Sequence, residues 1–268
     1  MAGHSHWSSI KHKKGAADAK KGKLFSKLAK NIMVAARKGG GNPDDNLRLR
    51  YAIDKARAES MPKDSIERAI KKGTGDLEGG SLEELVYEGI GPGGVSLILE
   101  VLTDNRNRTS SELRAVFDKR GGRLGSSGSV AWKFERKGVI RLPRGLLTEE
   151  ELYEVGIEAG AENIAAEEDG FQVTTKPADL DAVRAALEKA LAARQPPPAK
   201  RHGAEEERPS PLRHCELERI PLVTVPVDAH KAPQLLQLLS ELEEHEDVQN
   251  VSSDFELPEE ILKEAAKG

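Results

Sequence analysis

Apolar side chains recur with a helical period through the first part of the chain. Between residues 18 and 38 most apolar side chains fall in one arc of a helical wheel and most of the cations in a second arc, with Val34 inside the basic arc and Lys21 near the apolar one. This pattern predicts a helix that ends at residues 39–41, because glycine adopts the left-handed cap conformation without strain. Two further helices are predicted over residues 43–60 and 63–72. Three short helices with brief connections indicate a small bundle.

The pattern changes after Leu77 to short β-type runs that alternate with helices. The predicted helices cover residues 109–120, 148–160, 178–193 and 230–245. The predicted strands cover residues 93–103, 129–134, 139–142, 164–168, 171–175, 222–227 and 248–255. Thr148 is followed three residues later by Glu151, which is the pattern of a capping box at a helix start. The order βαβ, βαββα, βαβ suggests that the last unit completes the first across an insertion.

We therefore predict an α+β multidomain protein, with an N-terminal three-helix bundle followed by two small α+β domains of ferredoxin-like packing, one inserted in the other. The bundle covers residues 1–75. The split domain covers residues 76–137 plus 216–256, and the inserted domain covers residues 138–194. Residues 195–215 are predicted to form a Pro/Glu-rich linker that is exposed and partly extended, because they contain almost no apolar side chains.

The charge of the chain is distributed unevenly. The 268 residues carry a formal net charge of −4, from 41 Lys and Arg against 45 Asp and Glu. Residues 1–75 contain 18 cations and 7 acids and so carry +11, whereas the other 193 residues carry −15. The net charge thus hides a basic N-terminal part and an acidic remainder, which suit different partners.

The motifs that mark common enzymes are absent from the sequence. There is no P-loop, no pair of histidines at zinc-protease spacing and no nucleophile elbow. The glycine-rich segment 89–94 precedes a predicted strand, whereas a dinucleotide loop follows one. The single cysteine, Cys215, excludes a disulfide framework and zinc sites built on cysteine pairs, and we interpret it as a structural or incidental thiol. We expect no enzyme, no catalytic residues and no small-molecule substrate.

Metals, cofactors and membranes are not expected either. His4, His6 and His12 lie near the N-terminus, but no carboxylate or thiol completes a metal site around them, so we predict neither a metal nor a cofactor. The longest apolar run, residues 95–102, is far shorter than the roughly 20 residues of a membrane span. The N-terminus has no apolar segment of the secretory type. We therefore expect a cytoplasmic protein.

The basic N-terminal part is the positive functional signal. Dense cations attract a polyanion because neutralised phosphates release condensed counterions, and flat rings beside them can stack on bases. The alternative is a charged helix that is only solvated. The candidate nucleic-acid contacts are Trp7, Lys11, His12, Lys13, Lys14, Lys20, Lys23, Lys27, Lys30, Arg37 and Lys38.

A second candidate contact is the arginine pair at a predicted strand-to-helix junction. Arg106 and Arg108 combine guanidinium groups with a helix N-terminus, and both features suit phosphate. The alternative is a polar turn in which Thr109 or Asn107 caps the helix. The sequence supports the two interpretations equally.

Several short motifs together resemble the YebC/PmpR family, whose eukaryotic relatives include the mitochondrial translational activator of cytochrome oxidase. The resemblance spans nearly the whole chain. The segment 195–215 departs from the family pattern and looks like an insertion. The motifs that carry the resemblance are residues 1–7 (MAGHSHW), 10–14 (IKHKK), 22–28 (GKLFSKL), 87–94 (YEGIGPGG), 104–109 (DNRNRT) and 247–251 (DVQNV).

The resemblance implies a three-domain, non-enzymatic cytoplasmic protein with a helical N-terminal domain followed by two α+β domains. Members of the family are generally described as DNA-binding regulators of transcription. Others are implicated in translation, where they act at the ribosome to relieve stalling on proline-rich nascent chains. The resemblance also implies nucleic-acid contacts at Lys11, Lys13, Lys14, Lys23 and Lys27. Duplex DNA and ribosomal RNA present the same kind of backbone phosphate, so both stay open as partners at this point.

Overall fold

The computed structural model describes residues 18–78, 80–167, 170–194, 200–201, 204–205, 212 and 214–257. The chain divides into two compact units. The first unit comprises Met1–Ala52, Met61–Glu135 and Ile220–Gly268, and the second comprises Ile53–Ser60 and Arg136–Arg219. None of the helices in the described part of the chain combines the length and apolar content of a membrane span.

Three helices open the described chain: α2 (Asp18–Gly39), α3 (Leu47–Ala58) and α4 (Lys63–Thr74). They confirm the three predicted helices, and α2 ends where Gly40 takes a positive φ of 87°. The second helix begins later than predicted because Asn46 caps it, its Oδ1 accepting a hydrogen bond from Leu49 N at 3.1 Å. The Asn46 amide also donates to the carbonyl oxygens of Ala35 and Gly40, so one buried side chain joins the end of α2 to the start of α3.

The interior of this helical part follows the apolar arc of α2. Ile32 and Leu28 are buried, as is Ile66 of α4. Leu47 lies half-exposed in the first turn of α3, whereas Leu49 is buried. The helices α2 and α4 approach closely at Gly73, where any side chain would collide with the backbone of α2.

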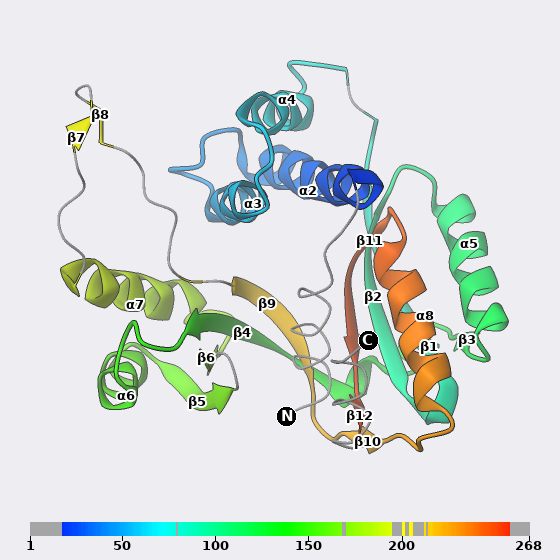
Figure 1. The fold of residues 1–268 in the computed structure, drawn as a ribbon. Helices are drawn as coiled ribbons and strands as arrows, with labels where there is room; N and C mark the ends of the chain where they lie inside the picture. Colours follow the sequence, from blue (N-terminus) through cyan, green and yellow to red (C-terminus); the bar gives the residue numbers. More distant parts are fainter. Residues whose placement is uncertain are drawn as a thin grey trace. The chain divides into compact units, whose positions relative to one another are not determined.

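The first unit also contains a four-stranded antiparallel sheet. Its strands are β1 (Glu83–Ile90), β2 (Ser96–Thr103), β3 (Arg123–Leu124) and β11 (Val248–Ser253), in the order β11-β2-β1-β3. The helices α5 (Arg106–Lys119) and α8 (Ala232–Glu244) cover one face of this sheet (Figure 1). The buried contacts between helices and sheet include Leu97, Leu99, Leu113, Phe117, Leu235, Leu238 and Val251.

The second unit contains another four-stranded sheet, in the order β5-β6-β4-β9. Along the chain its elements alternate as β4, α6, β5, β6, α7 and β9, which is the βαββαβ connectivity of a ferredoxin-like domain. The capping box at the start of α6 is present as predicted. The bounds are β4 (Phe134–Pro143), α6 (Glu149–Glu158), β5 (Ala161–Glu167), β6 (Gly170–Thr175), α7 (Leu180–Arg194) and β9 (His214–Pro221).

The α+β multidomain class is thus confirmed, but one predicted strand is wrong and another is shorter than predicted. Of the strand predicted over 129–134, residues 129–133 do not form a strand, because the Glu88 carboxylate accepts hydrogen bonds from the backbone here and holds a 3₁₀ turn, η2 (Ala131–Lys133). The strand predicted over 222–227 is shortened to β10 (Val225–Pro226), and it is preceded by β9, which was not predicted. β1 was also missed.

Several short strands and a second 3₁₀ turn complete the fold. β10 pairs in parallel with β12 (Phe255–Glu256). Within the predicted linker, β7 (Lys200–Arg201) pairs with β8 (Ala204–Glu205), and most other residues of that segment lie outside the described chain. Residues 92–94 form a second 3₁₀ turn, η1 (Pro92–Gly94), so β2 starts later than predicted. The domain boundaries given from the sequence stay predictions.

Candidate nucleic-acid interface

The carboxylate of Asp247 is the centre of a polar cluster in the first unit. Asp247 lies between α8 and β11 and is only 2% exposed. Its Oδ1 lies 2.5 Å from Lys30 Nζ of α2. Its Oδ2 accepts hydrogen bonds from Arg108 at 2.8 Å and from the Thr109 hydroxyl at 2.7 Å, both on α5. The carboxylate therefore joins α2, α5 and the α8–β11 loop.

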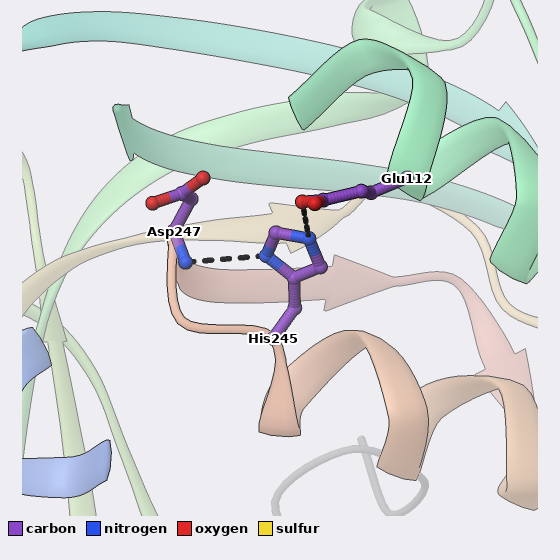
Figure 2. Close-up of side chains that lie close together, drawn as sticks. All are labelled: Glu112, His245 and Asp247. Carbon is purple, nitrogen blue, oxygen red and sulfur yellow. Dashed lines mark hydrogen bonds and ion pairs between the residues drawn. The ribbon is translucent and has the colours of Figure 1, made fainter. Parts of the chain in front are cut away.

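Two further residues complete this cluster (Figure 2). The backbone N–H of Asp247 donates to His245 Nδ1 at 3.2 Å, and His245 Nε2 lies 3.0 Å from a Glu112 oxygen. Because a backbone N–H can only donate, Nδ1 is the acceptor, and Nε2 carries the proton that faces Glu112. We call the set Asp247, Lys30, Arg108, Thr109, His245 and Glu112 the Asp247 junction.

The atoms of this junction that could bind a metal ion already have other partners. One ligand atom each from Glu112, His245 and Asp247 lies within 4.8 Å of the others, a grouping that could in principle hold a metal ion. However, the Asp247 carboxylate is neutralised by an ammonium and a guanidinium group, and both His245 nitrogens have hydrogen-bond partners. The contacts are those of an ion-pair junction between helices.

The protonation of Asp247 follows from the same contacts. Burial raises the pKa of its carboxyl group, but hydrogen bonds from Lys30, Thr109 and Arg108 outweigh burial and hold the pKa well below its usual range. The carboxylate therefore stays ionised at neutral pH. The hydrogen bond to Asp247 in turn raises the pKa of the Arg108 guanidinium.

The structure turns the middle of the predicted basic arc of α2 toward the protein. Lys27 Nζ donates to the carbonyl oxygen of Glu243, and Lys30 belongs to the Asp247 junction. Asn31 and Gln249 share a hydrogen bond of 3.1 Å on the same side of α2. Val34, which interrupts the basic arc, is buried. This side of α2 thus packs on the α8–β11 region.

The described cations near the two ends of α2 are exposed. Arg37 donates to the carbonyl oxygen of Gly80, and Lys38 pairs with Glu84 at 2.8 Å, although both side chains remain exposed. Lys23 is exposed, and so is Lys21, which the helical wheel placed near the apolar arc. The Lys20 side chain lies outside the described part. The same holds for Trp7, Lys11, His12, Lys13 and Lys14.

The arginine pair is divided by the structure. Arg106 is exposed in the first turn of α5, whereas Arg108 belongs to the Asp247 junction. The cap of this helix is Asn105, whose side chain accepts from Arg108 N at 3.1 Å, and neither Thr109 nor Asn107 has that role. Thr109 is instead directed at Asp247.

The junction itself was not predicted, although two of the quoted motifs contain its residues. Residues 104–109 and 247–251 each carried part of the family resemblance, and the structure brings them together across 139 positions. No local pattern links them, because the contact depends on how α5 packs beside α8. The resemblance was the one signal that singled out both segments.

Cys215 lies against the core of the second unit. Burial raises the pKa of its thiol to about 12. A thiol that stays protonated near neutral pH is a poor nucleophile. This agrees with the interpretation of Cys215 as a structural residue.

Two family models match the chain. Residues 5–76 match the TACO1/YebC protein N-terminal domain, and residues 82–196 match the TACO1/YebC second and third domain. The boundary between these matches falls at the loop between α4 and β1.

Relatives match over nearly the full length. A probable transcriptional regulatory protein of Geobacter sulfurreducens is 49% identical over 98% of this chain and 99% of its own. One from Natranaerobius thermophilus is 47% identical, again over 98% of this chain and 99% of its own. The crystal structure of a conserved hypothetical protein from Aquifex aeolicus matches with a TM-score of 0.80 and 47% identity, covering 96% of this chain and 99% of that one.

Proposed function

The chain belongs to the TACO1/YebC family, and on that premise we propose that it is a regulatory protein that binds nucleic acid through its N-terminal helical part. It acts by binding and not by catalysis, in the cytoplasm. Relatives that align over their full length are named probable transcriptional regulatory proteins, which supports a regulatory role. By analogy with them, our first candidate partner is duplex DNA.

One observation carries the proposal: residues 1–75 hold a charge of +11 in a chain whose remainder holds −15. A polyanion is attracted to the basic part and repelled by the acidic part, which orients its approach. The exposed Lys21 and Lys23 begin this surface in the described chain, and Lys11, Lys13 and Lys14 precede them in the sequence.

A second candidate partner is structured RNA of the ribosome, and the packing of α2 favours it. A helix that reads DNA sequence places one polar face in the major groove. Here the side of α2 that carries Lys27, Lys30 and Asn31 contacts the protein. Contacts by the remaining cations would be made to backbone phosphate, which suits recognition of shape and charge more than of base sequence.

The test compares the two partners directly. The protein is titrated with a promoter-containing duplex and with a scrambled duplex, and is co-sedimented with ribosomes at matched salt. Promoter DNA bound well above scrambled DNA, without ribosome association, would support the transcription candidate. Ribosome association with equal, weak duplex binding would support the translation candidate. Absence of binding to every polyanion at low salt would overturn the proposal.

A pair of charge reversals tests whether binding depends on the basic part. Lys21→Glu with Lys23→Glu should weaken binding to either polyanion and reduce its salt dependence. The matched control is Lys176→Glu with Lys189→Glu, which makes the same charge change at exposed positions of the second unit. Equal losses in both variants would show that only the total charge matters.

A further inference from the structure

Three apolar side chains stand out by their exposure in the described part of the chain. Trp132 is 70% exposed, Leu222 62% and Val223 74%, whereas the other exposed large apolar side chains reach only 37–49%. The backbone N–H of Leu222 donates to the carbonyl oxygen of Lys133 at 2.9 Å, so the three residues lie on adjoining segments of the first unit. We call these three residues the Trp132 patch.

The turn that carries Trp132 is held firmly. Three backbone N–H groups, those of Gly128, Val130 and Ala131, donate to the buried carboxylate of Glu88 at 2.6–2.8 Å. Burial raises the pKa of Glu88, but these hydrogen bonds outweigh it and lower the pKa overall, so the carboxylate stays charged. A charged acceptor strengthens each bond. The exposed ring is therefore displayed by a fixed turn.

The indole ring is itself fixed, and its hydrogen-bonding group is already used. Trp132 Nε1 donates to the carbonyl oxygen of Ser129 at 3.3 Å. The ring can therefore offer a partner its flat face and edges but no free donor. A flat aromatic face without a hydrogen-bond requirement suits stacking.

A cation lies beside the Trp132 ring, whereas next to Val223 the Thr224 hydroxyl donates to the Glu256 carboxylate at 2.8 Å. Residues 121–134 and 220–227 contain no Asp or Glu and include Arg123 and Lys133. Lys133 Nζ lies 5.8 Å from the centre of the Trp132 ring. The carboxylate that approaches Lys133, at 3.5 Å, is the buried Asp254, which also accepts from Ser96 N.

We propose that the Trp132 patch binds an unpaired base of a single-stranded or looped nucleic acid, with the base stacked on Trp132 and Lys133 facing the adjoining phosphate. Leu222 and Val223 supply apolar contact beside the stacked base. Paired bases in a duplex cannot reach such a ring, so the site selects unpaired segments. The inference rests on the proposed function and deepens it by naming the form of nucleic acid. A protein segment is the other class of partner that a patch of this kind could bind.

The two tryptophans of the chain make the test direct, because Trp7→Phe leaves Trp132 as the single tryptophan. This variant is titrated with a 20-nucleotide single strand and with a duplex of the same length, at matched salt, while tryptophan fluorescence and oligonucleotide anisotropy are recorded. The single strand should quench Trp132, and the duplex should leave its emission unchanged. Trp132→Ala should weaken single-strand binding roughly 5- to 150-fold, the range given by the loss of one stacked base.

Two variants control for indirect effects. Trp132→Phe keeps a stacking ring and should retain most of the affinity. Ile157→Ala removes an exposed apolar side chain from the second unit and should change nothing. Unquenched Trp132 and unaltered affinity in Trp132→Ala, in a protein whose binding still depends on Lys21 and Lys23, would overturn this inference and leave the proposed function standing.

Other outcomes are also decisive. If no nucleic acid binds under any condition, the proposed function fails and this inference fails with it. If the protein self-associates in sedimentation, and Trp132→Ala abolishes self-association without affecting nucleic-acid binding, the patch is a protein contact and the inference is wrong.

Discussion

Lys30 Nζ of α2 lies 2.5 Å from Asp247 Oδ1, although 217 positions separate the two residues in the chain. The pair links the basic helical part to the loop between α8 and β11. A cation that the sequence assigned to nucleic acid thus meets a buried carboxylate in the folded protein. The same carboxylate accepts a hydrogen bond from Arg108, which was also predicted to contact nucleic acid. Part of the basic character of this protein therefore stabilises its own fold.

Asp247→Asn should destabilise the protein. The substitution removes the charge that compensates Lys30 and Arg108, and breaking a buried pair in this way costs roughly 2–4 kcal/mol after allowance for the partial exposure of the cations. Urea unfolding monitored by circular dichroism measures the change. The control is Asp104→Asn, an exposed partner of Arg108, which should stay within about 0.5 kcal/mol of the wild type. Equal losses in both variants would contradict a special role for Asp247.

The stabilisation by Asp247 should depend on pH. Because its pKa is lower in the folded protein than the unfolded value of about 3.9, its contribution is fully present above that value and is lost as the pH falls through the folded pKa. The difference in unfolding free energy between wild type and Asp247→Asn should be constant from about pH 5 to 7 and shrink toward pH 2. A difference that stays unchanged down to pH 2 would show that the charge of Asp247 is not what stabilises the junction.

Removal of the charge of Lys23 should weaken polyanion binding, whereas removal of the charge of Lys30 should lower stability. Lys23→Gln should leave stability within about 0.5 kcal/mol and weaken polyanion binding, because Lys23 is exposed. Lys30→Gln should lower stability by roughly 1–3 kcal/mol, because it leaves Asp247 with one cation fewer. Thermal unfolding and anisotropy titrations measure the two effects separately. The reverse assignment of effects would place Lys30 at the interface and Lys23 in the fold.

Glu88→Gln should loosen the turn that carries Trp132. A carboxamide is neutral and keeps one acceptor oxygen, so at least one backbone N–H among residues 128–131 loses its acceptor and the others lose a charged one, at a cost of about 1–3 kcal/mol. Hydrogen exchange of the amides in this segment should speed up. Glu83→Gln, at the exposed start of the same strand, is the control and should leave exchange unchanged.

The sequence predicted the elements whose signal is local. The helices α2, α4, α6 and α8 follow apolar periodicity and end signals carried by adjoining residues. It failed at β1 and β9, where acidic and basic side chains interrupt the apolar alternation. In β9, Glu216 and Glu218 lie in the strand beside cations from distant parts of the second unit, Lys55 and Arg141. Partners far away in the sequence help to neutralise these charges, and a local pattern does not reveal them.

The sequence predicted a basic surface in the N-terminal part but not which of its cations face the protein. The uneven charge is a property of composition and can be read without a structure. The helical wheel of α2 placed Lys23, Lys27 and Lys30 together but could not say which side of the basic arc would pack on the protein. Val34, an apolar residue inside that arc, was the sign that part of it is buried.

By itself, then, the sequence determined the helical N-terminal part, the α+β class, the family resemblance and the contrast between +11 and −15, because each depends on composition or on neighbouring residues. The tertiary structure decided which cations stay available and which are used internally. It also decided that Trp132 is exposed while Phe117 is buried. These outcomes depend on strand pairing and helix packing between distant segments, and a local pattern carries no information about which distant carboxylate or apolar surface a side chain will meet.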